Sequence, residues 1–265
     1  MDDYKVVENN MMSNPKKKIL CVGLVCYDIV NVVASFPTED TQTRTIEQRR
    51  SRGGNASNMT TVLSHLNIPC EFLGSLPSET SPDTNFVKED FQRHNIGYDM
   101  CPRYDGYLLP NSCIILNNET GSRTILHTND GLPELTVNDF SKIDLENCTW
   151  VHLEGRPNAE QLAEIAKMIK TKFPRIPISL EMEKPTRANK DELFLVLPYI
   201  DLLFISKECA SSLGATCMTE AVELFKAMLP SNACVVCPWG EKGAAGKDAK
   251  GNIFEVACYP PPSGR

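Results

Sequence analysis

The chain has 265 residues, 42% of them hydrophobic, which is enough to bury one large core with at most one smaller lobe. Its 27 Lys and Arg against 34 Asp and Glu give a net charge of −7, and no basic stripe with interleaved aromatic residues is present, which argues against nucleic acid as a partner. Because its 11 cysteines follow no framework spacing, and because it has neither a secretory leader nor an apolar run of membrane length, the chain is predicted to be cytoplasmic with no membrane contact.

The amino-terminal part divides into a tail and a first strand. Residues 1–16 are polar and aperiodic, which predicts a flexible tail, and residues 17–265 are expected to form a single domain. The apolar run of residues 19–26 is typical of a strand covered on both faces in a parallel sheet. Asp28 follows directly, at the place where open α/β sheets position ligand contacts. A solvated loop aspartate fits that position equally well.

Two later segments have a different character. Residues 31–52 consist of short β-like pieces with Pro37 and several threonines, and residues 107–127 contain two strand-like pieces around the turn at residues 117–121. The two segments are predicted to form one small sheet outside the main domain. Arg123 is then expected on the return strand of the hairpin.

The clearest helix covers residues 55–67 and begins directly after Gly53 and Gly54. Its predicted inward face consists of apolar residues at helical spacing, namely Ala56, Met59, Val62, Leu63 and Leu66. Two glycines before a helix let the backbone approach a ligand, and free N–H groups of the first turn point toward it. Asn55 and Asn58 lie on one side of that turn, and their amides suit a polyol. A plain turn with Asn55 as the N-cap is the alternative interpretation.

The remaining segments alternate between strands and helices. Strands are predicted at residues 70–75, 150–154, 178–182, 201–206 and 234–238, and helices at residues 83–94, 158–172, 190–197, 207–213 and 219–229. Such a βαβ series implies a mostly parallel, layered sheet.

Cys234 and Cys237 match C-x-x-C, but they lie in an apolar strand on opposite faces, which favours a core role over a redox or zinc site. Gly240 and Gly243 follow this strand and form a second candidate ligand loop.

Six segments together carry a family resemblance: Asp28, Gly53-Gly54-Asn55-Ala56-Ser57-Asn58, Gly121-Ser122-Arg123-Thr124, His152-Leu153-Glu154-Gly155-Arg156, Glu181-Met182-Glu183-Lys184-Pro185 and Trp239-Gly240-Glu241-Lys242-Gly243. From about Lys17 to Pro262 the chain resembles the ketohexokinase branch of the ribokinase-like (PfkB) carbohydrate kinases. The resemblance implies an α/β fold in which helices cover both faces of a mostly parallel sheet, with a small β-sheet lid formed by residues 31–52 and 107–127. It also implies a homodimer formed through the lids, and transfer of the ATP γ-phosphate to the 1-hydroxyl of fructose.

The same resemblance assigns roles to individual positions. It places Asp28, Gly54, Asn55 and Asn58 on the hydroxyls of fructose, with Asp40 near the sugar from the lid of the same or a partner subunit. It places Arg123 on the ATP phosphates, and it lines the nucleotide with Gly240, Glu241, Lys242 and Gly243. Arginine supplies the charge-assisted contact that a phosphate needs.

Two departures from the family pattern limit this assignment. Where relatives hold Mg²⁺ with Asn-x-x-Glu, this chain has Ser206-Lys207-Glu208-Cys209, so Mg²⁺ is expected but its ligands are not assigned. Where relatives continue with Asp-Thr-x-Gly-Ala-Gly-Asp, whose glycine amides form the anion hole and whose last Asp is the catalytic base, this chain reads Ser263-Gly264-Arg265, so no catalytic residue is assigned.

That second departure leads to three expectations. The carboxyl-terminal part of the fold is expected to be missing, as in a splice variant or an incomplete gene model, and apolar sheet surface is expected to be open to water. Kinase activity is expected to be absent. A non-catalytic protein that binds fructose or forms dimers is the competing hypothesis.

Overall fold

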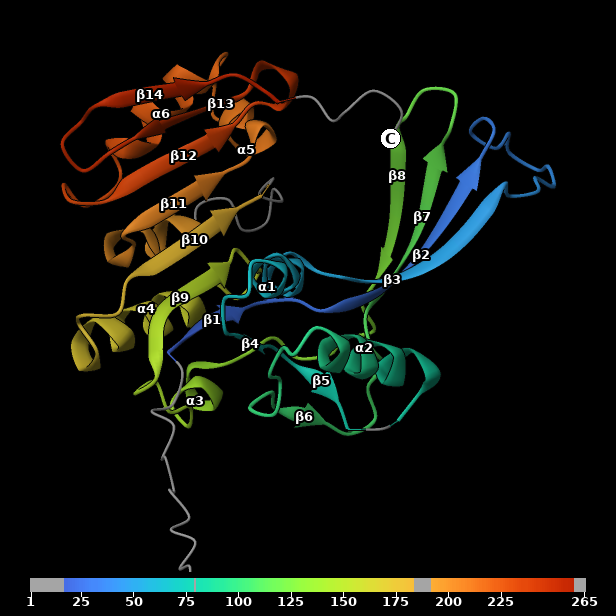
Figure 1. The fold of residues 1–265 in the computed structure, drawn as a ribbon, viewed down its shortest axis with the longest axis horizontal. Helices are drawn as coiled ribbons and strands as arrows, with labels where there is room; N and C mark the ends of the chain where they lie inside the picture. The colour runs from blue at the N-terminus through green and yellow to red at the C-terminus, as the bar shows by residue number, and fades with distance from the viewer. Residues whose placement is uncertain (1–16, 79, 184–191, 260–265) are drawn as a thin grey trace, which may run out of the picture.

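A computed structural model describes residues 17–78, 80–183 and 192–259, so the predicted tail, Lys184-Pro185 and the final proline run lie outside the described residues. The main element is an eight-stranded sheet (Figure 1). Its strands in spatial order are β14 (Ile253–Val256), β13 (Ala244–Lys247), β12 (Cys234–Pro238), β11 (Leu202–Ile205), β10 (Ile178–Met182), β9 (Cys148–Glu154), β1 (Lys18–Val22) and β4 (Cys70–Leu73). The strands from β12 to β4 pair in parallel, and β13 and β14 add an antiparallel edge, which confirms the predicted α/β architecture.

Helices cover both faces of this sheet. One face packs against α4 (Ala159–Lys172), α5 (Lys207–Ser212), α6 (Met218–Lys226) and the short elements α3 (Val137–Phe140), η1 (Glu192–Leu195) and η2 (Leu197–Tyr199), which share one apolar cluster. The opposite face packs against α1 (Asn55–His65) and α2 (Pro82–Arg93) in a second cluster. The predicted inward face of residues 158–172 is confirmed, because Leu162, Ile165, Ala166 and Ile169 are all buried.

A separate four-stranded sheet, called the lid here, stands beside the main sheet in Figure 1. Its order is β3 (Glu47–Gly53), β2 (Cys26–Val33), β7 (Asn111–Asn117) and β8 (Arg123–Thr128). The prediction of one small sheet from two distant segments is confirmed. The short strands β5 (Leu76–Pro77) and β6 (Arg103–Tyr104), which the sequence patterns did not indicate, pair with each other next to α2.

One predicted strand is in fact two. The apolar run of residues 19–26 leaves the main sheet after Val22, and Cys26 already begins lid strand β2. Asp28 therefore lies within the lid and not past the end of a main-sheet strand, which corrects the sequence interpretation. Apolar character did not reveal the break, because the residues on both sides of it are buried. At Gly23, directly after the end of β1, an added Cβ would lie 2.4 Å from Oε2 of Glu154, so a side chain does not fit at this point of the break.

The inward face of α1 also differs from the prediction. Val62 and Leu66 are 53% and 63% exposed, while the buried positions are Ala56, Ser57, Thr60 and Leu63. The helix is rotated because Arg52 is buried against it and donates to the carbonyl and hydroxyl oxygens of Ser57. A hydrophobic pattern counts only apolar residues, so it cannot detect a face that is packed through small polar ones.

Part of the main sheet remains uncovered on the side of α1. Trp150, Leu202 and Phe204 are only partly buried there and contribute to an apolar groove of about 150 Å³. Apolar sheet surface is thus open to water, as the sequence predicted. Within the described ranges, no helix combines the length and the apolar character needed to cross a bilayer.

Candidate active site at the base of the lid

A cavity of about 320 Å³ lies where the lid joins the core. Five of the predicted site residues line it, namely Asp28, Gly54, Asn55, Asn58 and Arg123. They come from β2, from the start of α1 and from β8, elements that lie far apart in the sequence. The structure therefore brings the predicted sugar contacts and the predicted phosphate contact into one space.

The glycine pair shapes the floor of this cavity. Gly54 is the N-cap of α1 with φ of 95°, and an added Cβ would lie 2.2 Å from the carbonyl oxygen of Leu24, so only glycine fits. At Gly53 an added Cβ would lie 2.2 Å from Oδ2 of Asp28. Asn55 is the first helical residue, so the alternative interpretation of Asn55 as an N-cap was wrong. Gly53 thus lets the backbone approach Asp28, and Gly54 lets it approach Leu24.

Glu154, at the end of β9, was not assigned a role from the sequence. Its Oε2 accepts hydrogen bonds from the backbone N–H groups of Leu24 and Ala56, both at 2.9 Å, and only 5% of the residue is exposed. Because Gly54 has no side chain to cap α1, this carboxylate replaces the missing N-cap and complements the positive end of the helix. Arg156 lies 3.4 Å from Oε1 of Glu154.

Charge around Glu154 is balanced locally. Burial raises the pKa of its carboxyl group, while Arg156 and the two amide donors act in the opposite direction. Arg156 also pairs with Glu134 at 2.5 Å. Both Glu154 and Arg156 line the cavity. A carboxylate at the end of a buried parallel strand was the available sequence signal, since that is where such sheets place ligand contacts.

Three other lid residues at the cavity were also missed. Ser112 on β7 and His127 on β8 are hydrogen-bonded, with 3.1 Å between Oγ and Nδ1. Cys26 donates to Oδ1 of Asp28 at 3.3 Å. Alternation along each strand places these side chains on the cavity face of the lid. The sequence could not identify them because their strand partners were unknown.

The other predicted site residues lie outside this cavity. Asp40 is exposed in the loop between β2 and β3, at the outer end of the lid. The segment from Gly240 to Gly243 follows β12, three strands away from β9 along the carboxyl edge of the main sheet. At Gly243, which has φ of 99°, an added Cβ would lie 1.9 Å from the carbonyl oxygen of Val256, so this glycine allows β14 to pack closely. Glu241 and Lys242 are exposed in the same turn.

The described residues contain no cluster of side chains that marks a metal site. They include no group of three or more His, Cys, Asp or Glu placed to hold a metal ion. Ser206 caps α5 by accepting from the N–H of Cys209. Glu181 lies near the cavity, and burial, together with the charges of Glu154 and Glu183, raises its pKa to about 7.

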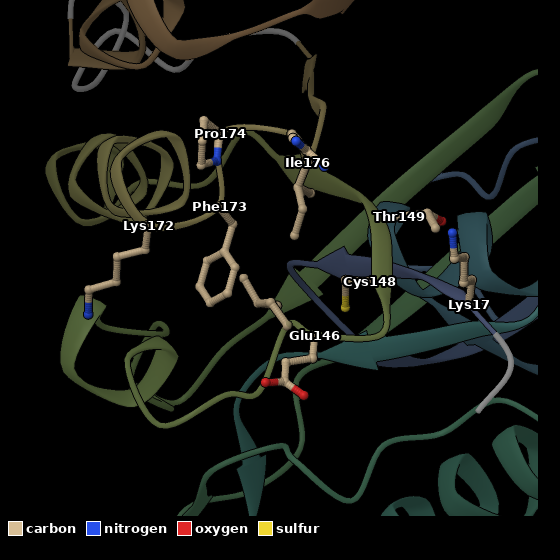
Figure 2. Close-up of a pocket in the computed structure, with 10 residues that line it drawn as sticks. Lys17, Glu146, Cys148, Thr149, Lys172, Phe173, Pro174 and Ile176 are labelled. Atoms are coloured by element: carbon tan, nitrogen blue, oxygen red, sulfur yellow. The ribbon is translucent and has the colours of Figure 1, made fainter. Parts of the chain in front are cut away.

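A second cavity, of about 750 Å³, lies at the opposite edge of the main sheet (Figure 2). Its walls come from the segments that enter β1 and β9 and from the end of α4. Figure 2 shows Lys17 and Lys172 at opposite ends of it, so their amino groups do not converge on one point. The smaller cavity, with its convergent polar groups, is therefore the candidate active site.

Comparison with known proteins identifies the family. The model of the pfkB family of carbohydrate kinases matches residues 16–262. The chain belongs to the pfkB family. This pfkB-family kinase is 38% identical to mouse ketohexokinase over 252 residues, which cover 93% of this chain and 83% of the mouse protein. Membership of the family indicates a phosphotransferase that acts on an alcohol group of a sugar.

Solved structures agree on the ribokinase-like fold of this pfkB-family kinase. Ribokinase from Giardia lamblia superposes with a TM-score of 0.78 at 20% identity, covering 94% of this chain and 77% of that protein. Ribokinase from Arabidopsis thaliana, complexed with ribose and ATP, gives a TM-score of 0.71 at 17% identity, covering 92% of this chain and 79% of that protein.

Proposed function

We propose that this chain is a ketohexokinase-like sugar kinase that transfers the γ-phosphate of ATP to the 1-hydroxyl of fructose, giving fructose 1-phosphate. The observation that carries the proposal is the single cavity that joins Asp28, Asn55 and Asn58 to Arg123. The carboxylate accepts hydrogen bonds from hydroxyl groups, and each asparagine amide both donates and accepts. The arginine guanidinium offers a forked contact to phosphate. The identity to mouse ketohexokinase supports a ketohexose as the sugar.

ATP is the proposed phosphate donor. The Arabidopsis ribokinase of similar fold binds ATP, and Arg123 supplies a fixed positive charge in the cavity of this chain. We assign the segment from Gly240 to Gly243 to the nucleotide beyond the phosphates, since it lies on the same edge of the main sheet. Mg²⁺ would neutralise charge on the phosphates when bound. Its ligands remain unassigned in this proposal.

We also propose a cytoplasmic homodimer formed through the lids. Several large apolar side chains of the lid and its outer loop are exposed, with relative exposures of 52% for Phe36, 61% for Ile46 and 59% for Leu126. Pairing of two lids would cover such side chains, and it would let the exposed Asp40 of one subunit approach the sugar of the other. Buried cysteines such as Cys21, Cys70 and Cys101 are free thiols, which supports a reducing compartment.

Calorimetry of the Asp28→Ala variant tests the sugar site. Loss of a charged hydrogen-bond acceptor is expected to weaken D-fructose binding by roughly 10- to 150-fold, with ATP binding changed less than about twofold. Glu47→Ala, which removes an exposed carboxylate at the outer end of β3, is the matched control and should bind both ligands normally. Equal losses of fructose and ATP binding in Asp28→Ala would remove Asp28 from the sugar site.

The Arg123→Lys variant tests the phosphate contact. Lysine keeps the charge but cannot make the forked contact, so ATP affinity is expected to fall about tenfold while fructose affinity stays largely intact. Arg50→Lys, at an exposed lid position away from the cavity, is the control. An unchanged dissociation constant for ATP in titration calorimetry would contradict the assignment of Arg123.

The competing function is a non-catalytic protein that binds fructose or forms dimers. It uses the same cavity and the same exposed lid, and it is compatible with a sequence that contains no Gly-Ala-Gly-Asp segment. Both functions predict fructose binding. Only the kinase predicts turnover, so a turnover assay separates them.

A further inference from the structure

Three polar side chains form a row across the cavity face of the lid. Asp28 on β2 pairs in register with Ser112 on β7, and Ser112 pairs in register with His127 on β8. Residues directly opposite each other on neighbouring strands point to the same face, and all three residues line the cavity. The edge strand of the lid therefore contributes a polar group to the same wall as Asp28.

The next row along the lid is apolar. Ile114 and Ile125 are register partners, and both also line the cavity. Arg123 lies beyond them on β8. A polyol at the base of the lid thus meets the hydrogen-bonding groups of Asp28, Ser112 and His127 in the first row and none in the second.

One ring nitrogen of His127 is already engaged. Its Nδ1 lies 3.1 Å from the hydroxyl oxygen of Ser112, and among the described residues Nε2 has no hydrogen-bond partner. The residue is exposed to the cavity and does not support the core. Neutral imidazole has one donor and one acceptor nitrogen, so Nε2 remains available for a ligand.

The charge state of the ring fits an uncharged ligand. Partial burial, followed by the charge of Arg156, lowers the pKa of His127, and Asp28 opposes this shift. The imidazole is therefore neutral at neutral pH. A neutral imidazole hydrogen-bonds a sugar hydroxyl without adding a second positive charge beside Arg156.

We propose that His127 binds a hydroxyl of the sugar through Nε2, opposite the hydroxyl that Asp28 holds, and that the edge strand of the lid thereby sets sugar affinity. The inference rests on the proposed function, since it requires a polyol in this cavity. The backbones of β2 and β8 are separated by two strand spacings, roughly 10 Å, so one polyol lying over Ser112 would span the distance between Asp28 and His127.

Three substitutions at His127, each measured by calorimetry with D-fructose and with ATP, test the inference. His127→Leu removes both nitrogens and is expected to weaken fructose binding about 5- to 30-fold. His127→Gln carries an amide that reaches the position of Nε2, and it should stay within about threefold of the unaltered chain. His127→Asn carries an amide at the position of Nδ1, so it should keep the bond to Ser112 and lose fructose affinity like His127→Leu. ATP affinity should be unchanged in all three.

The Gln and Asn variants separate ligand contact from local support. Restored fructose affinity in His127→Asn, but not in His127→Gln, would assign His127 to holding Ser112 and would overturn the inference. Unchanged fructose affinity in His127→Leu, with normal binding by the unaltered chain, would overturn this inference alone. Absence of fructose binding by the unaltered chain would overturn the proposed function and, with it, this inference. His65→Leu, at an exposed histidine near the end of α1, is the control and should bind fructose normally.

Discussion

Supplied with D-fructose, ATP and Mg²⁺, the 265-residue chain is expected to form ADP at least about 10⁴-fold more slowly than mouse ketohexokinase. A general base contributes roughly 10²- to 10⁴-fold to the rate, and anion-hole donors contribute roughly 10²- to 10³-fold more. The Gly-Ala-Gly-Asp segment, which the family resemblance implies would supply both, does not occur in this sequence. Of the carboxylates at the cavity, Glu154 is occupied by two backbone amides, and Asp28 is proposed to hold the sugar.

A coupled assay for ADP, with mouse ketohexokinase as the positive control, measures this rate. Fructose binding by the same preparation, followed by calorimetry, shows that the site is folded. Turnover within about tenfold of the mouse enzyme would show that a base lies within these 265 residues. Glu183, the remaining acidic residue at the cavity, would then be the first position to replace.

Replacing Glu154 by alanine is expected to lower the free energy of unfolding by about 3 to 5 kcal/mol, because removal of one partner leaves other buried polar groups unsatisfied. The N–H groups of Leu24 and Ala56 would lose their acceptor, and the start of α1 would lose its only cap. The floor of the cavity would be disturbed at the same time, so fructose binding should be lost as well.

Urea unfolding of matched variants tests the role of Glu154. Glu154→Gln keeps an acceptor for both amides and should lower the free energy of unfolding by only about 1 kcal/mol. Glu134→Ala removes the other, more exposed partner of Arg156 and should also have a small effect, about 1 kcal/mol or less. A Glu154→Ala variant within about 1 kcal/mol of the unaltered chain would show that water replaces the carboxylate.

The architecture could be predicted from the sequence because it depends on local patterns. The spacing of apolar residues in 158–172 predicted a helix, and the apolar runs predicted the buried strands that it covers. The turn at residues 117–121 predicted the hairpin of the lid. The family resemblance supplied the site assignments, and the structure gathers Asp28, Asn55 and Arg123 in one cavity as those assignments require.

Most of the missed features depend on contacts between residues that are far apart in the sequence. Glu154 accepts a hydrogen bond from Ala56, in the first turn of α1 and 98 positions earlier in the sequence, and no local pattern encodes such a pairing. The rotation of α1 arises from the buried Arg52. The role proposed for His127 is inferred from strand register, which is fixed only once β7 and β8 have paired.

The lid is joined to the core at one end, where Cys26 pairs with Gly53, and this attachment has a mechanical consequence. On β8, His127 lies near the attached end and Arg123 lies about 13 Å farther out, at roughly 3.3 Å per residue. A small tilt of the lid would therefore displace Arg123 much more than His127, as with two points on a lever. The proposed phosphate contact of Arg123 would therefore be more sensitive to the angle of the lid than the proposed sugar contacts near the attached end.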